Sequence, residues 1–589
     1  MKKFSKILSV ALLVALVLSL GVSSAFAVDQ QHTITITNND QFVSHTYEAY
    51  QVFKGDLSAD GATLSNIVWG NGVNGADILS ELTANNAPAD LSVFSACTDA
   101  ASVAKALGDN STAALADAFA KVVAKHLVAA NKYAFTASEK TYTATVPSDG
   151  YYFVQDVTTN LVDSNGNSDT VSKYILQVVK DVSVEAKDTG IPADKNIVEA
   201  DGSKVKEGSK NIGDVIDFEV TSKVPDTSAY TTYTFNMYDT LDAGLTYFDT
   251  LAVKFGDTLL TAGTDYTVTV KTGETAFEAP TTAAAAVTTA GGQTITINFT
   301  NIKTYGDVAD YQGKDIVITY KAVLNKNATM GVVPNENEVY FEYSNNPNDL
   351  TSKGNTPHII TKTYTTALDV LKVNGSSQAL EGAIFELTGM ASDFMVVSGE
   401  KFVEAGYTAQ AGETLGTTSY WKLVDGSYTS RDPQTTGTDT KQYADTTKTY
   451  FKVTMNNVVM STGTDTKSIQ VVSGADGKMV FTGLKPGTYT LTEIAAPDGY
   501  NKITTPINVV ITWDKDNGFK LGDASSEGWT ENKDSANASL GTFHLEVENN
   551  SGATLPCTGG IGTTIFYVVG GVLVLAAIIL LVTKKRMSE

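Results

Sequence analysis

The chain has 589 residues, of which 65 are acidic and 42 are basic, so its formal net charge at pH 7 is −23. A surface this acidic argues against nucleic acid or anionic lipid as a partner. Only two cysteines and five scattered histidines occur, which gives neither a disulfide framework nor a metal-ligand spacing. We therefore expect no cofactor and no metal, and a fold that is stabilised by something other than disulfides.

The N-terminus has the pattern of an export signal. Three lysines within the first six residues precede the apolar run ILSVALLVALVLSLGV, and SSAFA follows. A basic region, an apolar region and a cleavage site with small residues at Ala25 and Ala27 are the three parts of a secretory signal peptide. We predict a signal peptide over residues 1–27 and a mature chain that is exported.

Most of the remaining chain predicts β-strands. Short runs such as HTITITNND, DYTVTVKTG and PGTYTLTEI alternate apolar and polar residues and are bounded by Gly, Asn or Asp. A period of two is typical of antiparallel β-sandwiches. The Ala-rich segment Asp99–Lys132 instead has apolar residues at helical spacing. The predicted fold is mainly β, with tandem immunoglobulin-like sandwiches and a helical insertion in the first domain.

Two polar joints divide the strand-rich region. The first, EAKDTGIPADK, contains Gly and Pro, and the second begins SNNPNDLTSKGNTPH. They predict domains over residues 28–187, 188–362 and 363–554, each of a size that suits one sandwich with insertions. We interpret residues from about 393 to 466 as an elaborated insertion in the third domain.

The C-terminus combines a short motif, an apolar span and a basic tail. The motif is LPCTG, made of Leu555, Pro556, Cys557, Thr558 and Gly559. The uncharged run IFYVVGGVLVLAAIILLV follows, which as a helix of roughly 27 Å is long enough to cross a bilayer. The tail KKR then predicts a cytoplasmic C-terminus. We predict a transmembrane segment over residues 560–583 and a cytoplasmic tail over residues 584–589.

Together these three features resemble the cell-wall sorting signal of Gram-positive surface proteins, the LPxTG pattern. In that family a sortase cleaves between the threonine and the glycine, here Thr558 and Gly559, and transfers the threonine carbonyl to an amine. The resemblance implies that the motif is the substrate of another enzyme. Cys557 is then a filler residue and not a nucleophile, because the catalytic thiol belongs to the sortase.

The mature chain is similar to the SpaA-type backbone pilins that sortases assemble. The run ITITNNDQFVSHTYEAYQVFKGDLS resembles the start of their first domain, and DTLDAGLTY with NENEVYFEYSNNP resembles their isopeptide-forming second domain. The runs LDVLKVNG, GTYTLTEIAAPDGYN and FHLEVENNSG resemble a Cna-B domain, with Glu493 in its E-box.

A degenerate pilin motif, DVSVEAKDTG, resembles the segment that carries the polymerising lysine of that family. The resemblance gives this role to Lys187, with Lys180 and Lys195 as the neighbours to test against it. Lys180 has the strand parity of two following valines, so we expect its side chain to face inward.

Strand alternation gives the isopeptide resemblance a physical basis. It places Lys372 and Asn549 on inward faces beside valines, where an unsatisfied polar group costs several kcal/mol. Burial lowers the pKa of a lysine and raises the pKa of a glutamic acid. We expect Lys372 to be a neutral nucleophile, and a protonated Glu493 to hydrogen-bond the Asn549 carboxamide and polarise its carbonyl. Loss of ammonia then leaves a Lys–Asn amide.

The second domain repeats the pattern. Lys195 and Asn337 lie at inward positions of predicted strands, and Asp239 of YDTL supplies the acid. In the first domain Asp156 stands where a glutamate is expected, and we assign no cross-link to this domain. The segment DSNGNSDT, Asp163 to Thr170, predicts a hairpin turn and not a calcium loop, since it lacks the glycine and the final acidic residue of such loops.

These resemblances imply a structural protein and not an enzyme: the backbone subunit of a surface pilus, with Thr558 of one subunit joined to Lys187 of the next. The implied partners are further copies of the chain, pilin-class and housekeeping sortases, ancillary pilins and peptidoglycan, with a host or matrix ligand left open. The implied location is the cell wall, after a transient membrane-anchored precursor. A monomeric wall-anchored adhesin with a Cna-B stalk is the alternative, and the use of Lys187 as an acceptor separates the two.

Overall fold

The computed structural model describes residues 31–586 except 40, 59–62, 86–87, 111, 172, 187–190, 228–229, 301, 304–310, 348, 390–391, 436–438, 464–466, 498, 523–525, 527 and 552–560. The predicted signal peptide with Ala25 and Ala27, the pilin-motif Lys187 and the sorting motif Leu555–Gly559 lie outside the described residues.

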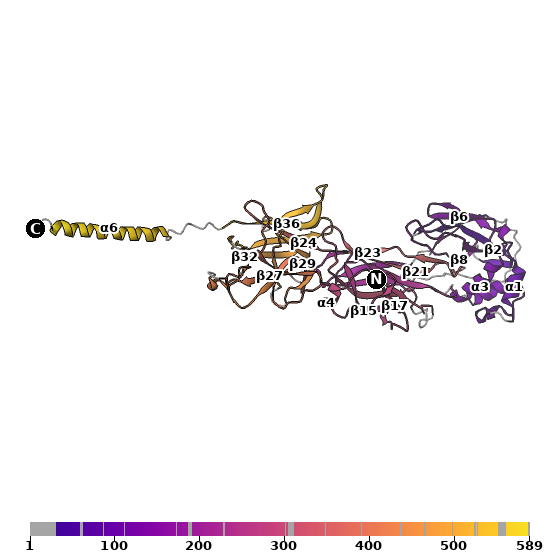
Figure 1. Ribbon diagram of the computed structural model, residues 1–589. Coiled ribbons are helices and arrows are strands. Elements are labelled where there is room, and N and C mark those ends of the chain that lie inside the picture. Colours follow the sequence, from indigo (N-terminus) through magenta and orange to yellow (C-terminus); the bar gives the residue numbers. More distant parts are fainter. Residues whose placement is uncertain are drawn as a thin grey trace.

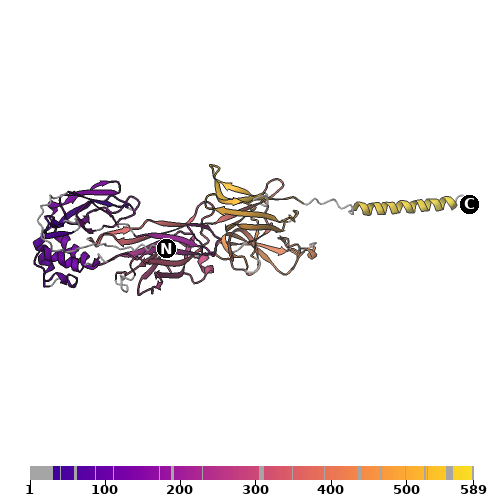
Figure 2. The ribbon, with the colours of Figure 1, turned by 180° about the vertical axis from the view of Figure 1, so that it is seen from behind.

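Three β-rich units follow one another along the molecule, and a long helix lies apart at one end (Figure 1). We call them the N-terminal unit (residues 31–186), the central unit (residues 191–364) and the C-terminal unit (residues 365–551). The view from behind shows the same order (Figure 2). The prediction of a mainly β fold built from sandwich-like domains is confirmed.

The N-terminal unit contains two small sheets, with strand orders β5–β6–β1–β9 and β3–β2–β7–β8, and β4 pairs with β2. The strands are β1 (His32–Thr37), β2 (Tyr47–Leu57), β3 (Leu64–Trp69), β4 (Tyr133–Ala134), β5 (Thr136–Ser138), β6 (Thr141–Val146), β7 (Gly150–Asp156), β8 (Lys173–Val178) and β9 (Val182–Glu185). Strand β9 is parallel to β1, so the beginning and the end of the unit lie on neighbouring strands. Ile34, Tyr142 and Tyr152 are buried in the cluster that joins the two sheets.

Helices fill the connection between β3 and β4. They are α1 (Gly75–Leu82), α2 (Ala100–Asp109) and α3 (Ala113–Lys125), with the 3-10 turns η1 (Ala89–Phe94) and η2 (Ala129–Asn131). The predicted helical insertion is confirmed, although it begins at α1 and not at Asp99. Asp99 caps α2 by accepting a 2.8 Å hydrogen bond from the Ser102 amide, which satisfies a free amide of the first turn. Phe119 of α3 stacks on Phe53 of β2 and so joins the helices to the sheet.

The central unit is a sandwich of a six-stranded and an eight-stranded sheet, with orders β11–β10–β13–β20–β15–β16 and β12–β23–β21–β14–β19–β17–β18, and β22 pairs with β21. Its elements are β10 (Ala193–Val198), β11 (Lys204–Val205), β12 (Glu207–Ser209), β13 (Val215–Lys223), β14 (Phe235–Leu241), β15 (Leu245–Phe255), β16 (Thr258–Leu259), β17 (Thr267–Thr272), β18 (Thr275–Ala276), α4 (Ala283–Thr288), β19 (Gln293–Asn298), β20 (Asp315–Leu324), β21 (Asn335–Ser344), β22 (Lys353–Asn355) and β23 (Ile359–Tyr364). Phe218, Phe235 and Phe341 are fully buried in its core.

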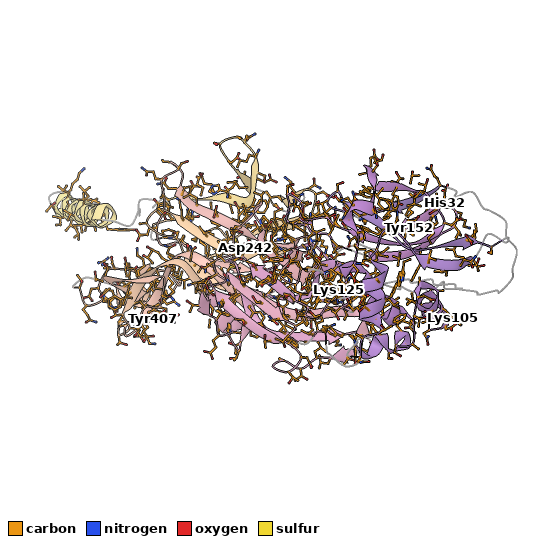
Figure 3. All side chains as sticks on the ribbon, turned by 90° about the vertical axis from the view of Figure 1, so that its right-hand side faces the viewer. His32, Lys105, Lys125, Tyr152, Asp242 and Tyr407 are labelled. Carbon is orange, nitrogen blue, oxygen red and sulfur yellow. The ribbon has the colours of Figure 1, made fainter. Side chains whose placement is uncertain are left out.

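The C-terminal unit has one sheet of 13 strands, with the main order β34–β33–β32–β25–β30–β26–β31–β24–β36–β35. Its elements are β24 (Thr366–Asn374), β25 (Ile384–Thr388), β26 (Phe394–Glu404), β27 (Glu413–Lys422), β28 (Tyr428–Thr429), η3 (Thr440–Gln442), β29 (Tyr450–Ser461), β30 (Ile469–Val472), β31 (Lys478–Leu484), β32 (Gly487–Ala495), β33 (Ile507–Asp514), β34 (Gly518–Leu521), β35 (Thr530–Lys533) and β36 (Ser539–Asn549). Strands β26 to β29 lie in the segment that we interpreted as an insertion, and of these β27 to β29 lie outside the main order whereas β26 belongs to it. Tyr407 lies in the same segment (Figure 3). Leu368, Phe481 and Phe543 are buried in the core.

Hydrogen bonds between units link the three cores. The Tyr343 hydroxyl of the central unit donates to the Ser168 carbonyl of the N-terminal unit at 2.9 Å. The Ile212 amide donates to the Gly483 carbonyl across the second joint at 3.0 Å. Gly483 has a φ of +85°, and a Cβ there would lie only 2.4 Å from Cγ1 of Ile212. This close approach between the central and C-terminal units therefore requires a glycine.

Helix α6 (Ile561–Arg586) follows the C-terminal unit. Its segment Tyr567–Lys585 is long and apolar enough to cross a membrane, and none of it is covered by the rest of the chain. It overlaps most of the predicted transmembrane segment, and Lys584 lies within the last turn of the helix.

A buried histidine in the N-terminal unit lies between two carboxylates. His45 Nδ1 is 2.5 Å from Asp156 Oδ2, and His45 Nε2 is 3.1 Å from Asp169 Oδ2. All three side chains are fully buried. Asp156, at the position where the resemblance placed a glutamate, therefore contacts a histidine and not a lysine. Asp169 also accepts hydrogen bonds from the Phe42 and Val43 amides, so the cluster holds three segments together.

Replacing His45 with Ala should destabilise the N-terminal unit by about 3–5 kcal/mol, because Asp156 and Asp169 would then face each other in a buried site without a cation or donor between them. Urea unfolding of the purified ectodomain measures the loss. His126→Ala is the matched control, since its ion pair with Glu81 is partly exposed and should contribute less than about 1 kcal/mol. Equal losses in the two variants would contradict a special role for His45.

Candidate functional site

Three predicted residues of the central unit meet in its core. Lys195 comes from β10 in one sheet, whereas Asp239 on β14 and Asn337 on β21 come from the opposite sheet. Strands β14 and β21 are paired with Asp239 opposite Val339. Alternation along each strand turns all three side chains inward, and each is at most 1% exposed.

A fourth residue, Tyr320 of β20, completes a chain of hydrogen bonds. Lys195 Nζ donates to Asp239 Oδ2 at 2.6 Å, and the Tyr320 hydroxyl donates to Asp239 Oδ1 at 2.8 Å. Asn337 Nδ2 donates to the Tyr320 oxygen at 2.7 Å. The remaining polar atom, Asn337 Oδ1, is buried and has no hydrogen-bond partner among the described residues. The acid therefore reaches the amide only through the tyrosine.

Burial in this core favours the neutral forms of the ionisable groups. It lowers the pKa of Lys195 to about 8, although the Asp239 carboxylate opposes the shift. Burial likewise raises the pKa of Asp239, against the influence of Lys195, and it raises the pKa of Tyr320 well above its ordinary value. Lys195 Nζ also lies 5.3 Å from the centroid of the Phe218 ring. Burial thus shifts both groups toward the neutral amine and the protonated acid that the reaction requires.

The C-terminal unit contains the second predicted set. Lys372 lies on β24, Glu493 on β32 and Asn549 at the end of β36, and each is at most 3% exposed. Strands β24 and β36 are parallel neighbours, with Lys372 opposite Val547. Asn549 is two residues further along β36 and therefore lies diagonally from Lys372 on the same face of the sheet.

Among the described residues, no carboxylate lies within hydrogen-bond distance of the Lys372 amine. Its Nζ donates to the carbonyls of Val547 at 2.8 Å and Val373 at 3.2 Å. Burial lowers the pKa of Lys372 to about 8, although the charge of Glu493 opposes the shift. The neutral amine that a nucleophile requires is therefore accessible here too.

Glu493 contacts the amide directly, in a way that differs from the sequence-based hypothesis. Asn549 Nδ2 donates to Glu493 Oε1 at 2.8 Å, and the Ile503 amide donates to Oε2 at 2.6 Å. The hypothesis placed a proton on Glu493 to polarise the Asn549 carbonyl, but that carbonyl oxygen is buried without a partner among the described residues. Exchange of Oδ1 and Nδ2 by a half-turn of the amide plane would bring it to the acid.

Sequence reasoning had no specific reason to select Tyr320. The available signal was the run DIVITYKAVL, in which alternation puts Tyr320 on the face of Ile316 and Ile318. An inward tyrosine is common in sandwich cores, however, and only the three-dimensional structure reveals that its hydroxyl lies between Asp239 and Asn337.

The expectation for Lys180 is wrong. Its side chain is exposed, because the residue lies in the bend before β9 and not on the strand itself. Lys187, one residue after the buried Ala186, lies outside the described residues. The Asp163 segment forms a turn in which Asp163 Oδ1 accepts hydrogen bonds from the Asn165 and Asn167 amides.

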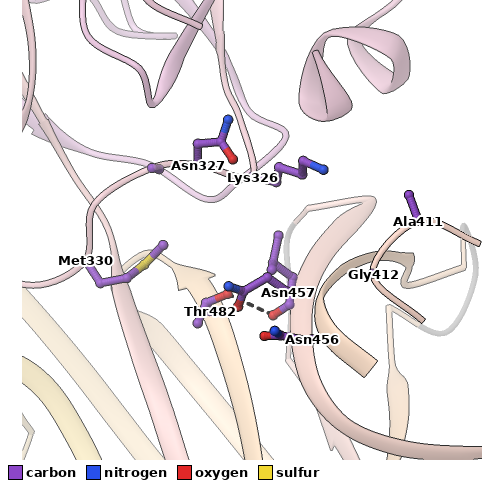
Figure 4. Close-up of a pocket in the computed structure, with 10 residues that line it drawn as sticks. Lys326, Asn327, Met330, Ala411, Gly412, Asn456, Asn457 and Thr482 are labelled. Carbon is purple, nitrogen blue, oxygen red and sulfur yellow. Dashed lines mark hydrogen bonds between the residues drawn. The ribbon is translucent and has the colours of Figure 1, made fainter. Parts of the chain in front are cut away.

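A cleft of about 490 Å³ lies at the joint between the central and C-terminal units (Figure 4). Lys326, Asn327 and Met330 line it from the central unit, and Asn456, Asn457 and Thr482 line it from the C-terminal unit. Lys326 is the only ionisable residue among the ten that line the cleft. None of these ten residues forms a nucleophile–base pair.

Comparison with known families gives two matches. Residues 441–524 match the SpaA family, described as a prealbumin-like fold domain. Residues 547–589 match the LPXTG cell wall anchor motif of Gram-positive proteins. The first match lies within the C-terminal unit and includes Glu493, and the second includes the sorting motif and α6.

A curated relative is the trypsin-resistant surface T6 protein of Streptococcus pyogenes serotype M6. It is 25% identical over 292 residues, which are 46% of this chain and 48% of that protein. The match therefore spans about half the length of the relative.

Similar solved structures include three backbone or major pilins. The T6 backbone pilin of S. pyogenes is 15% identical, with 90% of this chain and 100% of that chain covered and a TM-score of 0.44. SpaD of Corynebacterium diphtheriae is 15% identical, with 90% and 99% covered and a TM-score of 0.39. BcpA of Bacillus cereus is 12% identical, with 89% and 100% covered and a TM-score of 0.36. The two family matches show that the chain carries a SpaA prealbumin-like domain and an LPXTG cell wall anchor, and so belongs with the cell-wall-anchored surface proteins of Gram-positive bacteria.

Proposed function

We propose that the chain is the backbone subunit of a covalently polymerised surface pilus, cross-linked within each subunit by two Lys–Asn isopeptide bonds. The observation that carries the proposal is the buried lysine, acid and asparagine set that recurs in two consecutive units of a wall-anchored chain. A buried polar set of this kind is costly to keep as separate side chains, but it is the set of reactants that an amide bond between strands requires.

The same chemistry fits both sites. The neutral lysine Nζ attacks Cγ of the asparagine, and the carbonyl electron pair moves to Oδ1. In the central site Asp239 already contacts Nζ and can accept its proton directly, whereas in the C-terminal site Glu493 contacts Asn549 and receives the Lys372 proton only after the new C–N bond has brought Nζ to Asn549. A proton is delivered to Nδ2 in both sites, so that ammonia leaves when the carbonyl re-forms. One C–N bond forms, one C–N bond breaks, and the acid is regenerated. Each site reacts once, so the chain is its own substrate and not a turnover enzyme.

The bonds would stabilise the units against both heat and tension. Lys195–Asn337 would close a loop between β10 and β21, and Lys372–Asn549 would join β24 to β36. In the chain-entropy treatment used for disulfides, a closed loop of this length contributes roughly 5 kcal/mol. Strands that are covalently joined also cannot separate under tension, so the unfolding rate falls as well.

Polymerisation would use two residues outside the described part of the chain. A pilin-class sortase would cleave the Thr558–Gly559 amide and transfer the Thr558 carbonyl, through its own thioester, to Nζ of Lys187 on the next subunit. This contact joins different surfaces and does not close on itself, so it builds a filament. A housekeeping sortase would transfer the last Thr558 to peptidoglycan, and ancillary pilins would join the same assembly.

The intact mass of the purified ectodomain, residues 28–558, tests the intramolecular bonds. We expect it to be two ammonia masses below the sequence mass. Glu493→Ala should restore one ammonia, because Asn549 loses its acid, and Asp239→Ala should restore the other. Peptide mapping should assign the two bonds to Lys372–Asn549 and Lys195–Asn337.

Lys401→Ala is the matched control for these variants, because Lys401 is a partly buried lysine whose side chain bonds Tyr407 and Glu413 and not an asparagine among the described residues. Its mass deficit should be unchanged apart from the substitution. An ectodomain with the unmodified sequence mass would rule out both bonds.

Stability in alkaline solution tests the state of the unlinked amine. In Glu493→Ala, Lys372 stays free. Burial lowers its pKa to about 8 in the native site, against an unfolded value of 10.5, and loss of the Glu493 charge, which raises that pKa, lowers it further. The folded state then binds fewer protons than the unfolded state between these values, so its stability should rise with pH across that window, by on the order of 2 kcal/mol.

Urea unfolding at about pH 7.5 and about pH 10 measures this gain for the C-terminal unit. The double variant Lys372→Met, Glu493→Ala is the control, because it lacks the amine and should show no such gain. A similar gain in the control would assign the pH dependence to other groups.

High-mass ladders in denaturing gels of wall extracts test polymerisation. Lys187→Ala should abolish the ladder, because the acceptor amine is missing, while single subunits still reach the wall through Thr558. Lys180→Ala, which removes an exposed lysine of the same region, should leave the ladder intact. If wild-type cells that express a pilin-class sortase form no ladder, the monomeric adhesin becomes the better account.

A further inference from the structure

The two candidate cross-linking sites differ in how the acid reaches the amide nitrogen. In the C-terminal unit Glu493 Oε1 accepts a hydrogen bond from Asn549 Nδ2 directly, at 2.8 Å. In the central unit the Tyr320 hydroxyl lies between them, 2.7 Å from Asn337 Nδ2 and 2.8 Å from Asp239 Oδ1. The other oxygen of Asp239 contacts Lys195 Nζ at 2.6 Å. The central site is thus a continuous chain from the nucleophile to the leaving group.

We propose that Tyr320 is a catalytic residue of the central site, which relays a proton from Asp239 to the departing amide nitrogen of Asn337. The proposal rests on the isopeptide chemistry of the proposed function and assigns to the central bond a residue that the C-terminal bond does not need. Tyr320 qualifies because its hydroxyl contacts the reacting amide itself.

The proposed proton transfers balance, because one proton leaves Lys195 Nζ and one proton reaches Asn337 Nδ2 along the series of hydrogen bonds. The relay starts from a protonated Asp239 whose Oδ1 donates to the Tyr320 oxygen, while the Tyr320 hydroxyl turns toward Asn337 Nδ2, which reverses the two hydrogen-bond directions of the unreacted chain. As the C–N bond forms, Cγ becomes tetrahedral and Nδ2 can accept a hydrogen bond. Lys195 Nζ then gives a proton to Asp239 Oδ2, and the proton on Asp239 Oδ1 passes to the Tyr320 oxygen. The original Tyr320 proton passes to Asn337 Nδ2, and the Cγ–Nδ2 bond breaks with its electron pair on the leaving ammonia. Asp239 and Tyr320 end in their starting protonation states.

The surroundings of Tyr320 suit a relay that stays protonated. Burial raises its pKa well above the ordinary value, so the hydroxyl keeps its proton until the transfer. Its ring stacks on Phe218 with centroids 5.3 Å apart and packs against Tyr247 at 6.1 Å. Removal of the hydroxyl alone would therefore leave the ring contacts in place.

Timed mass spectrometry after cell-free synthesis of the whole ectodomain tests the relay. In Tyr320→Phe we expect formation of the Lys195–Asn337 bond to slow by at least about 100-fold, while the Lys372–Asn549 bond of the same molecule forms at the wild-type rate. The C-terminal bond thus reports on synthesis and handling in every sample. Tyr343→Phe is the matched control: Tyr343 is a buried tyrosine of the same unit whose hydroxyl contacts Ser168 and not the site. It should form both bonds at the wild-type rate.

A more acidic phenol distinguishes proton transfer from packing. With 3,5-difluorotyrosine in place of Tyr320, we expect the rate at which the Lys195–Asn337 bond forms to depend on pH in a different way, because the fluorinated phenol titrates at lower pH. If Tyr320 only fills space, the pH dependence of this rate should stay unchanged. This measurement decides the question if Tyr320→Phe fails to fold. Wild-type rates in Tyr320→Phe, or an unchanged profile with the fluorinated residue, would overturn the relay. Absence of the central bond from the wild-type chain would instead overturn the proposed function.

Discussion

The burial of a lysine amine inside a β-sandwich is the constraint on which the central and C-terminal units depend. Lys195 and Lys372 are both fully buried, and each loses the hydration that would stabilise its ammonium form. Hydrogen bonds to the amines compensate for part of this lost hydration. Asp239 accepts from Lys195 in the central unit, and the carbonyls of Val373 and Val547 accept from Lys372 in the C-terminal unit. The asparagine beside each lysine keeps one buried oxygen without a partner among the described residues. A buried site in which some hydrogen-bonding atoms lack partners destabilises the fold if its side chains stay separate. The same arrangement is expected if the lysine and the asparagine are reactants that become joined by an amide bond.

Alternation in the sequence predicted which polar side chains turn inward, because a strand period of two leaves little freedom once its apolar residues are buried. Lys195 and Asn337 could be placed inward in this way, whereas the role of Asp239 as the acid came from the resemblance to isopeptide-forming domains. The role of Tyr320 could not be predicted, since a partner across the sandwich depends on how two sheets face each other and not on any local pattern. For Lys180 the prediction was wrong for a different reason. We expected its side chain to face inward as if Lys180 belonged to β9, but this strand begins only at Val182. Parity has meaning only within a strand, and strand ends are the least predictable part of a sequence.

The buried polar cluster of the N-terminal unit contains a histidine and two aspartates among its described side chains, and no lysine. Each lysine of this unit whose side chain is described is exposed. Asp156 occupies the corresponding inward position but contacts His45, which also contacts Asp169. An imidazole that joins two carboxylates satisfies all three groups and leaves no amide to react. Asp169 lies next to Ser168, whose carbonyl accepts from Tyr343 of the central unit, so the cluster also fixes the segment that forms the first joint.

The proposed linkage gives this difference between the units a mechanical reason. If subunits are joined through Lys187 and Thr558, tension enters after the N-terminal unit and leaves after the C-terminal unit. The central and C-terminal units then bear the load, and they are the two that contain the lysine and asparagine sets. The N-terminal unit then lies outside the part of the chain that carries the tension, so reversible hydrogen bonds are sufficient to keep it folded. The same reasoning bears on strands β27 to β29, which branch from β26 outside the main order of the sheet and lie within the loop that a Lys372–Asn549 bond would close. Force would pass from β24 to β36 without crossing these strands, so this segment is free to be enlarged at no mechanical cost to the filament.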